Sequence, residues 1–135
     1  MSSLGSESLQ IKINTNVTAT IRDTNVELWC SYINDGGDYI SNIKMKARNK
    51  TSEEYLQIAK CYPPESNRDA VLKGEYLNGR VSLTNPTGEL SKAILTFNKI
   101  QCVDDTDYMC VISHEIDITD TTTSTSSISI TVTSK

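Results

Sequence analysis

The chain has 135 residues and a net charge of −4 at pH 7, a size that suits one domain with a packed core. The acidic balance excludes the basic surface that nucleic-acid binding needs, so we expect no nucleic-acid partner. Thirty-seven residues are β-branched and only five are alanine, which indicates β-sheet rather than helix. No apolar run approaches the roughly 18 residues of a membrane span, so we expect no membrane insertion. The N-terminal segment lacks the apolar stretch of a secretion signal, and any such signal is expected to have been removed.

Along most of the chain, apolar side chains alternate with polar ones, which is typical of half-buried strands. From the N-terminus, the positions expected to face a core are Leu9, Ile11 and Ile13; Val17, Ala19 and Ile21; Val26, Leu28, Cys30 and Tyr32; Ser41, Ile43, Met45 and Ala47; Leu56 and Ile58; Val81 and Leu83; Leu95 and Phe97; Tyr108, Cys110 and Ile112; and Ile128, Ile130 and Val132. Turn-forming sequences separate these segments, as at residues 22–25, 34–38 and 85–88. Short strands at this spacing, with few helical signals, predict an all-β sandwich or barrel.

Two stretches depart from this pattern. Residues 61–79 contain Pro63-Pro64 and a polar segment, which leaves room for at most a short edge strand. Residues 119–127 are almost all Thr, Ser and Asp, and are too polar for a core. We therefore expect a loop over residues 113–127 before a final strand, with His114 at the point where the preceding strand ends and this loop begins.

The chain has four cysteines and no C-x-x-C pair among them: Cys30, Cys61, Cys102 and Cys110. Their even number and spacing favour two structural disulfides over a zinc site. Asn16 and Asn49 stand in acceptable N-glycosylation sequons, whereas a third sequon contains proline. Disulfides and sequons together predict an extracellular protein, either secreted or part of a cell-surface ectodomain.

The segment that ends at Cys110 carries a specific motif. Asp104, Tyr108 and Cys110 match the pattern D-x-[GA]-x-Y-x-C, and Thr106 departs from it at the small position. The segment therefore resembles the E–F corner and F strand of immunoglobulin-superfamily domains, of which this pattern is the hallmark.

The resemblance covers residues 9–134, and residues 55–59 are similar to a C′ strand, which C-type domains lack. The chain thus resembles the V-set of the superfamily. This implies an all-β fold, a two-sheet Greek-key β-sandwich that forms one domain over residues 9–134. Residues 1–8 are expected to be a flexible segment before it.

The V-set resemblance assigns structural roles to five residues. Cys30 and Cys110 would form the disulfide between the sheets, and the Tyr108 hydroxyl would bond to backbone upstream of it. Arg80 would form a bidentate, partly buried ion pair with Asp104 at the base of the sandwich.

Two positions depart from the family pattern. The tryptophan expected in the core on strand C is replaced by Met45. Trp29 lies beside Cys30 in the sequence, so it is expected to point away from the core.

If Cys30 pairs with Cys110, then Cys61 and Cys102 remain for a second disulfide. An extra cysteine before the corner resembles invertebrate immune-type or cell-surface V-like domains, including those that head secreted fibrinogen-related defence lectins of molluscs. The alternative is that both disulfides only stabilise a core limited by a hydrophobic content of 37%.

The sequence does not indicate catalysis. His114 is the only histidine, no G-x-S-x-G motif is present, and the acidic clusters lack the residue order of a calcium loop. We therefore expect no enzymatic activity, no metal and no other cofactor.

Alternation also predicts which side chains point outward and could bind a partner. If Tyr108 and Cys110 face the core, one sheet displays a set of outward residues with an apolar centre. This predicted binding face consists of Lys44, Lys46, Tyr55, Gln57, Met109 and Val111. A competing patch around Trp29 lies on the opposite sheet.

The resemblance implies an extracellular, non-catalytic recognition module of a receptor, adhesion molecule or secreted immune-type protein. It would bind a protein or glycan ligand through the predicted face and the F–G loop, by heterophilic docking or as a weak homodimer. Acidic residues of the 115–120 loop could meet the lysines across such a dimer. The alternative is a structural spacer domain of a multidomain extracellular protein, with no ligand of its own.

Overall fold

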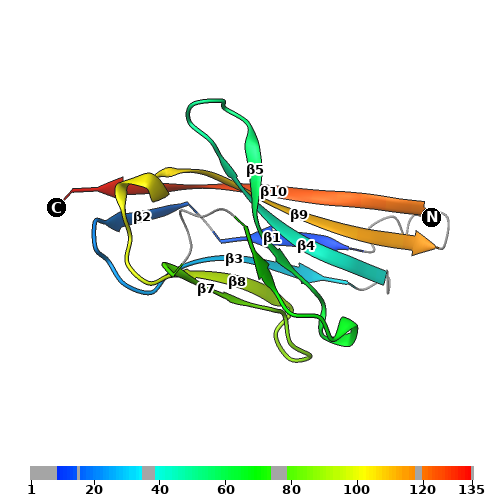
Figure 1. The fold of residues 1–135 in the computed structure, drawn as a ribbon. Coiled ribbons are helices and arrows are strands. Elements are labelled where there is room, and N and C mark those ends of the chain that lie inside the picture. The colour runs from blue at the N-terminus through cyan, green and yellow to red at the C-terminus, as the bar shows by residue number, and fades with distance from the viewer. Residues whose placement is uncertain (1–8, 15, 35–38, 74–78, 118–119, 135) are drawn as a thin grey trace.

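The computed structural model describes residues 9–14, 16–34, 39–73, 79–117 and 120–134, and the segment 1–8 lies outside these ranges. The described residues form two packed β-sheets joined by turns and short 3₁₀ helices (Figure 1). One sheet has the order β1 (Gln10–Ile13), β3 (Val26–Ile33), β8 (Lys92–Phe97), β7 (Val81–Thr84). The other has the order β2 (Val17–Thr20), β10 (Asp120–Thr133), β9 (Thr106–Asp117), β4 (Tyr39–Arg48), β5 (Tyr55–Cys61), β6 (Val71–Leu72). The 3₁₀ helices are η1 (Pro64–Ser66) and η3 (Cys102–Asp104).

The strand pairing identifies the type of sandwich. Neighbouring strands are antiparallel, except that β2 runs parallel to β10. β5 and β6 extend the larger sheet beyond β4, as the C′ and C″ strands do in variable-type immunoglobulin domains. The predicted V-set-like Greek-key sandwich is therefore confirmed. β6 is the short edge strand for which residues 61–79 left room.

Alternate residues of each strand point between the sheets and form the core. Cys30 on β3 and Cys110 on β9 make the predicted disulfide across it, with a Cα–Cα separation of 6.3 Å. Linking residues separated by 80 positions stabilises a fold by about 4–5 kcal/mol in the chain-entropy model. Met45 pairs with Cys110 in the register of β4 and β9 and is fully buried, so it occupies the core beside the disulfide.

The E–F corner contains the residues of the sequence motif. Tyr108 is fully buried, and its hydroxyl donates a hydrogen bond of 2.8 Å to the backbone carbonyl of Asp104. Asp104 itself has 0% exposure; its Oδ2 accepts from Arg80 Nη2 at 2.6 Å and from the backbone N–H of Gln101 at 2.8 Å. Asp104 Oδ1 accepts no hydrogen bond from the described residues. Arg80 therefore contacts one carboxylate oxygen of Asp104, and the expected bidentate ion pair is wrong.

β9 and β10 form a longer hairpin than the sequence predicts. β9 continues to Asp117, β10 begins at Asp120, and the two strands pair along this length. The predicted loop over residues 113–127 is therefore wrong, because backbone hydrogen bonds hold β10 and threonine suits a strand even without apolar neighbours. Figure 1 shows this orange hairpin extending past the ends of β3 and β8. Its tip, residues 118–119, lies outside the described residues.

His114 is another correction. It was expected at the end of the strand, as a loop residue, but it lies within β9, is 5% exposed and continues the inward alternation of Cys110 and Ile112. The polar composition of residues 113–127 led us to expect a loop. The alternation of inward and outward side chains nevertheless continues through His114.

The second predicted disulfide is absent: Cys61 is a buried free thiol and Cys102 is an exposed free thiol. Cys61 ends β5 and Cys102 begins η3, which lies near the opposite end of that strand, where Tyr55 pairs with Arg48. At about 3.3 Å per residue, the length of β5 keeps the two thiols roughly 20 Å apart. A disulfide needs Cα atoms within about 7 Å.

Candidate binding face

The outer surface of the six-stranded sheet brings the predicted binding residues together. Met109 and Val111 point outward from β9, because the residues between and beside them are buried. In the register with β4, Lys44 lies opposite Val111 and Lys46 lies opposite Met109. Gln57 on β5 pairs with Lys46, so it borders the same area. Both apolar side chains are half-buried and neither is part of the core.

Lys60 also belongs to this surface, although alternation alone places it inward. The register of β4 and β5 shifts between Met45 and Lys46, and this β-bulge leaves both Ile58 and Ala59 buried. Lys60 therefore returns to the outer side, directly opposite Lys44. The run Ile58-Ala59 was the only signal of the bulge in the sequence. We call the surface made by Lys44, Lys46, Tyr55, Gln57, Lys60, Met109 and Val111 the β9 face.

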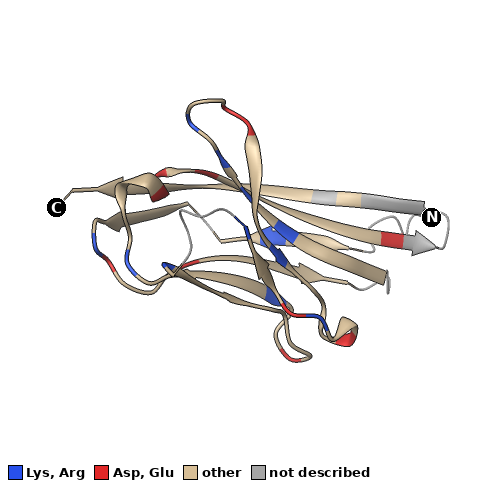
Figure 2. Cartoon of the chain, viewed as in Figure 1, with Lys and Arg blue, Asp and Glu red and all other residues tan. Residues whose placement is uncertain are grey.

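The three lysines of the β9 face occupy neighbouring positions on β4 and β5, and Lys60 Nζ lies 5.6 Å from the centroid of the Tyr62 ring. None of them lies within 4.0 Å of a carboxylate among the described residues, which contain four ion pairs elsewhere. Figure 2 shows the basic positions along β4 and β5 as blue segments. Like charges directly opposite on neighbouring strands destabilise a sheet, so the Lys44–Lys60 pair costs the fold stability.

A hydroxyl-bearing strand borders the apolar centre on its other side. Thr125 of β10 pairs with Val111, and Ser127 pairs with Met109. Both β10 side chains are exposed. The face is therefore apolar at its centre, cationic towards β5 and hydrogen-bonding towards β10.

Tyr55 lies at one end of the β9 face, beside a set of polar contacts. It pairs with Arg48, whose Nη1 is 3.6 Å from Asp107 Oδ2. Ser129 Oγ donates a hydrogen bond of 2.6 Å to Asp107 Oδ1. Tyr55, Asp107 and Ser129 line a shallow depression of about 260 Å³ together with Asn16.

The competing patch on the four-stranded sheet is partly covered, although Ile33 of β3 is 50% exposed. Trp29 is half-buried, and Lys92 Nζ lies 4.3 Å from the centroid of its ring. Ile94 pairs with Trp29 across β3 and β8 and is also half-buried. Lys92 therefore already covers one face of the Trp29 ring in a cation–π contact.

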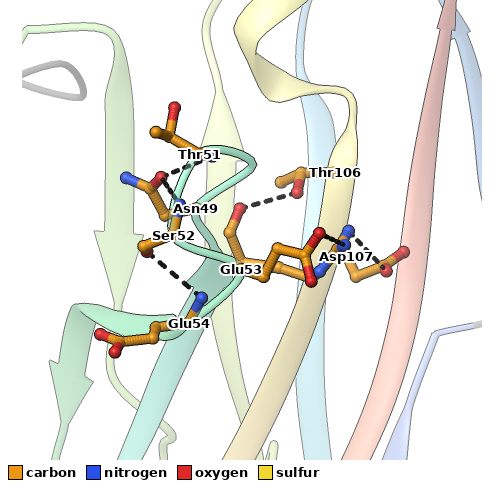
Figure 3. Close-up of polar contacts among 8 residues, drawn as sticks. Asn49, Thr51, Ser52, Glu53, Glu54, Thr106 and Asp107 are labelled. Atoms are coloured by element: carbon orange, nitrogen blue, oxygen red, sulfur yellow. Dashed lines mark hydrogen bonds and ion pairs between the residues drawn. The ribbon is translucent and has the colours of Figure 1, made fainter.

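Both predicted glycosylation sites are on exposed turns or strand edges. Asn49 Oδ1 accepts hydrogen bonds from the backbone N–H groups of Thr51 and Ser52, at 2.9 and 3.1 Å. Figure 3 shows this turn, with the Asn49 side-chain nitrogen pointing away from it. Asn16 Oδ1 accepts from the backbone N–H of Ser129 at 3.0 Å. In both residues the oxygen makes the contact, so the nitrogen that would carry a glycan is left for modification.

The structure also contains an apolar cleft that the sequence did not suggest. It has a volume of about 400 Å³ and lies between the start of β5, the β4–β5 turn and η3. Leu56 and Val103 contribute to it and are 48% and 52% exposed. Leu56 was expected in the core. It lies at the start of β5, where it lines this cleft instead.

The described residues offer few features of a metal-binding or catalytic site. Among them, no group of three or more His, Cys, Asp or Glu side chains is arranged to hold a metal ion. Burial raises the pKa of the Cys61 thiol to about 12, which disfavours a reactive thiolate. No helix in the described ranges is long and apolar enough to cross a membrane.

Comparison with known proteins supports the fold and does not extend to function. The chain is similar to a structure of murine CRIg, with a TM-score of 0.75 and 17% sequence identity. The similarity covers 93% of this chain and 98% of that one. No protein-family model and no curated protein matches the sequence. At this identity the likeness establishes the architecture, an immunoglobulin-like sandwich of variable type.

Proposed function

We propose that the domain, residues 9–134, is an extracellular, non-catalytic recognition module that binds a macromolecular ligand through the β9 face, with the β9–β10 hairpin adding contacts. The observation that carries this proposal is the composition of the face. Met109 and Val111 form a half-buried apolar centre that lies outside the core of the described residues, and methionine is common at interface cores. Polar and charged side chains surround this centre, as in protein interfaces.

The opposite sheet is the weaker choice of binding surface. Trp29 is already in contact with Lys92, and Ile94 is its one apolar cross-strand partner in the described part of the chain. The larger sheet also carries the longest hairpin, so a ligand on the β9 face would have more surface to contact.

The extracellular compartment is supported by the Cys30–Cys110 disulfide and by the exposure of Asn16 and Asn49. The narrower resemblance, to immune-type V-like domains of mollusc lectins, rested on the extra cysteine before the corner, Cys102. Because Cys61 and Cys102 are free thiols, we propose the broader class: a module of a receptor, an adhesion molecule or a secreted immune-type protein.

The test measures how fluorescent tetramers of the domain bind to intact cells and to immobilised extracellular proteins. It compares the parent domain with two single-substitution variants. Val111→Lys should abolish saturable binding, whereas Trp29→Lys should leave it within about twofold. Circular dichroism and thermal melting would establish that both variants fold. Loss of binding with Trp29→Lys alone would assign the function to the other sheet. Absence of saturable binding by the parent domain would favour the spacer.

A further inference from the structure

The lysines of the β9 face are the strongest unexplained feature of the surface. Lys44 and Lys60 lie directly opposite each other on β4 and β5. Neighbouring strands are about 4.8 Å apart, and Lys46 is two residues further along β4, at roughly 7 Å. Three lysines thus occupy neighbouring positions on the surface of a protein whose net charge is −4.

These lysines do not stabilise the fold by any ion pair among the described residues. Three basic side chains elsewhere on the protein do lie near carboxylates: Arg48 near Asp107, Lys50 near Asp105, and Arg80 near Asp104. The Lys44–Lys60 pair instead adds repulsion to the sheet. Such a cost is removed when carboxylates are brought to the lysines from outside.

We propose that the partner of the β9 face is an acidic protein segment, in which carboxylates flank an apolar side chain. This proposal rests on the proposed function and adds the chemistry of the ligand. The carboxylates would lie against Lys44, Lys46 and Lys60, and the apolar side chain would contact Met109 and Val111. Backbone or polar groups of the segment would reach the hydroxyls of Thr125 and Ser127 on β10.

A second copy of the chain does not fit the same position. A symmetric contact joins the same patch on both molecules, so it would place the lysines of one copy near those of the other. An anionic polysaccharide fits less well, because the centre of the face is apolar and the net negative charge of the protein repels a long polyanion. For a short acidic segment the same negative charge disfavours approach elsewhere and so favours docking at the lysines.

The proposal is tested by NMR titration with defined probes. One probe is a short synthetic peptide of glutamates around two leucines, and its control has glutamine in place of every glutamate. We expect the acidic peptide to shift the amide signals of Lys44, Lys60 and Val111, and the control peptide to bind about tenfold more weakly. Lys44→Glu/Lys60→Glu should weaken binding of the acidic peptide about tenfold.

The matched control is Lys12→Glu/Lys99→Glu, which makes the same change in net charge at exposed positions away from the face. It should alter affinity by less than about twofold. An equal effect of both double variants would mean that only the overall charge matters, and would overturn the proposal. Tighter binding of a heparin oligosaccharide, with the same dependence on the lysines, would replace the acidic protein segment by a polyanion.

The titration also separates this proposal from the proposed function. If both peptides bind equally, and Val111→Lys abolishes binding while the lysine reversal does not, the face is a binding site but its partner is not acidic. If the shifts map around Trp29, both proposals fail.

A measurement without any ligand provides a second test. Lys44→Glu replaces the repulsion with Lys60 by attraction, so we expect the melting temperature to rise by about 1–3 °C. A fall in melting temperature would show that Lys44 contributes to folding, and it would remove the argument that the lysines are kept for a partner.

Discussion

Asp104 is a carboxylate without exposed surface, and this makes its surroundings decisive for stability. Its Oδ2 receives two hydrogen bonds, one from Arg80 and one from the backbone of Gln101, and its own carbonyl accepts from the Tyr108 hydroxyl. One residue therefore connects β7, η3 and β9. A buried charge of this kind depends on its partners far more than an exposed one does.

We predict that Arg80→Ala destabilises the domain by about 3 kcal/mol, because the Asp104 charge then stays buried with only the Gln101 N–H beside it. Arg48→Ala is the matched control. The Arg48 guanidinium lies 3.6 Å from Asp107 and 3.9 Å from Glu53 in exposed surroundings, so its loss should cost less than about 1 kcal/mol. Urea unfolding followed by fluorescence measures both. Similar midpoints for the two variants would contradict the role given to Arg80.

The two free cysteines should react with an alkylating agent at different rates. Burial raises the pKa of Cys61 to about 12, so at pH 8 almost none of it is thiolate, whereas Cys102 is exposed. Iodoacetamide should therefore label Cys102 in the native protein and reach Cys61 only after denaturation. Raising the pH towards 12 should increase the rate at Cys61, as the pKa is approached from below. Peptide mapping that finds a Cys61–Cys102 disulfide, with no labelling, would restore the second bridge.

At the level of elements, the sequence predicts strands well wherever the inward residues alternate without interruption. β3 and β9 are examples, because Leu28 and Cys30, or Tyr108 and Cys110, recur at every second position. Two bulges break this rule, one in β4 and one in β5. One lies between Ile40 and Asn42 and buries Ile40 where Ser41 was expected to face inward.

The second bulge adds a residue to the candidate site, because it places Lys60 on the outer side of the sheet. A bulge is a property of two paired strands, so one strand's sequence seldom shows it. The cleft beside Leu56 and Val103 was missed for a similar reason. It depends on how the start of β5, the β4–β5 turn and η3 come together, which no local pattern encodes.

The length of β10 gives a prediction at this scale. Residues 121–127 are polar, but they pair with β9 in an antiparallel ladder, so every second amide donates to β9 and should be protected from hydrogen exchange. Exchange measured by mass spectrometry should be much slower for this segment than for the exposed β7–β8 turn at residues 85–91. Equal rates in the two segments would support the loop first expected from composition.

At the level of the whole molecule, charge separates the two ways in which the β9 face could be used. A contact between two copies opposes lysines to lysines, whereas an acidic partner opposes lysines to carboxylates. Added salt should therefore strengthen a contact between two copies and weaken the binding of an acidic partner. Raising the ionic strength from about 0.01 M to about 0.15 M shortens the screening length from about 30 Å to about 8 Å.

We predict that sedimentation of the unglycosylated domain at low salt shows a monomer, and that any self-association through the β9 face strengthens as salt is added. Binding of the acidic peptide should weaken over the same range, because its attraction to Lys44, Lys46 and Lys60 is screened. Val111→Lys should abolish the salt-induced association, and Trp29→Lys should leave it unchanged. Self-association that weakens with salt would mean that opposite charges meet between copies, and the lysines would then have a partner within the protein's own surface.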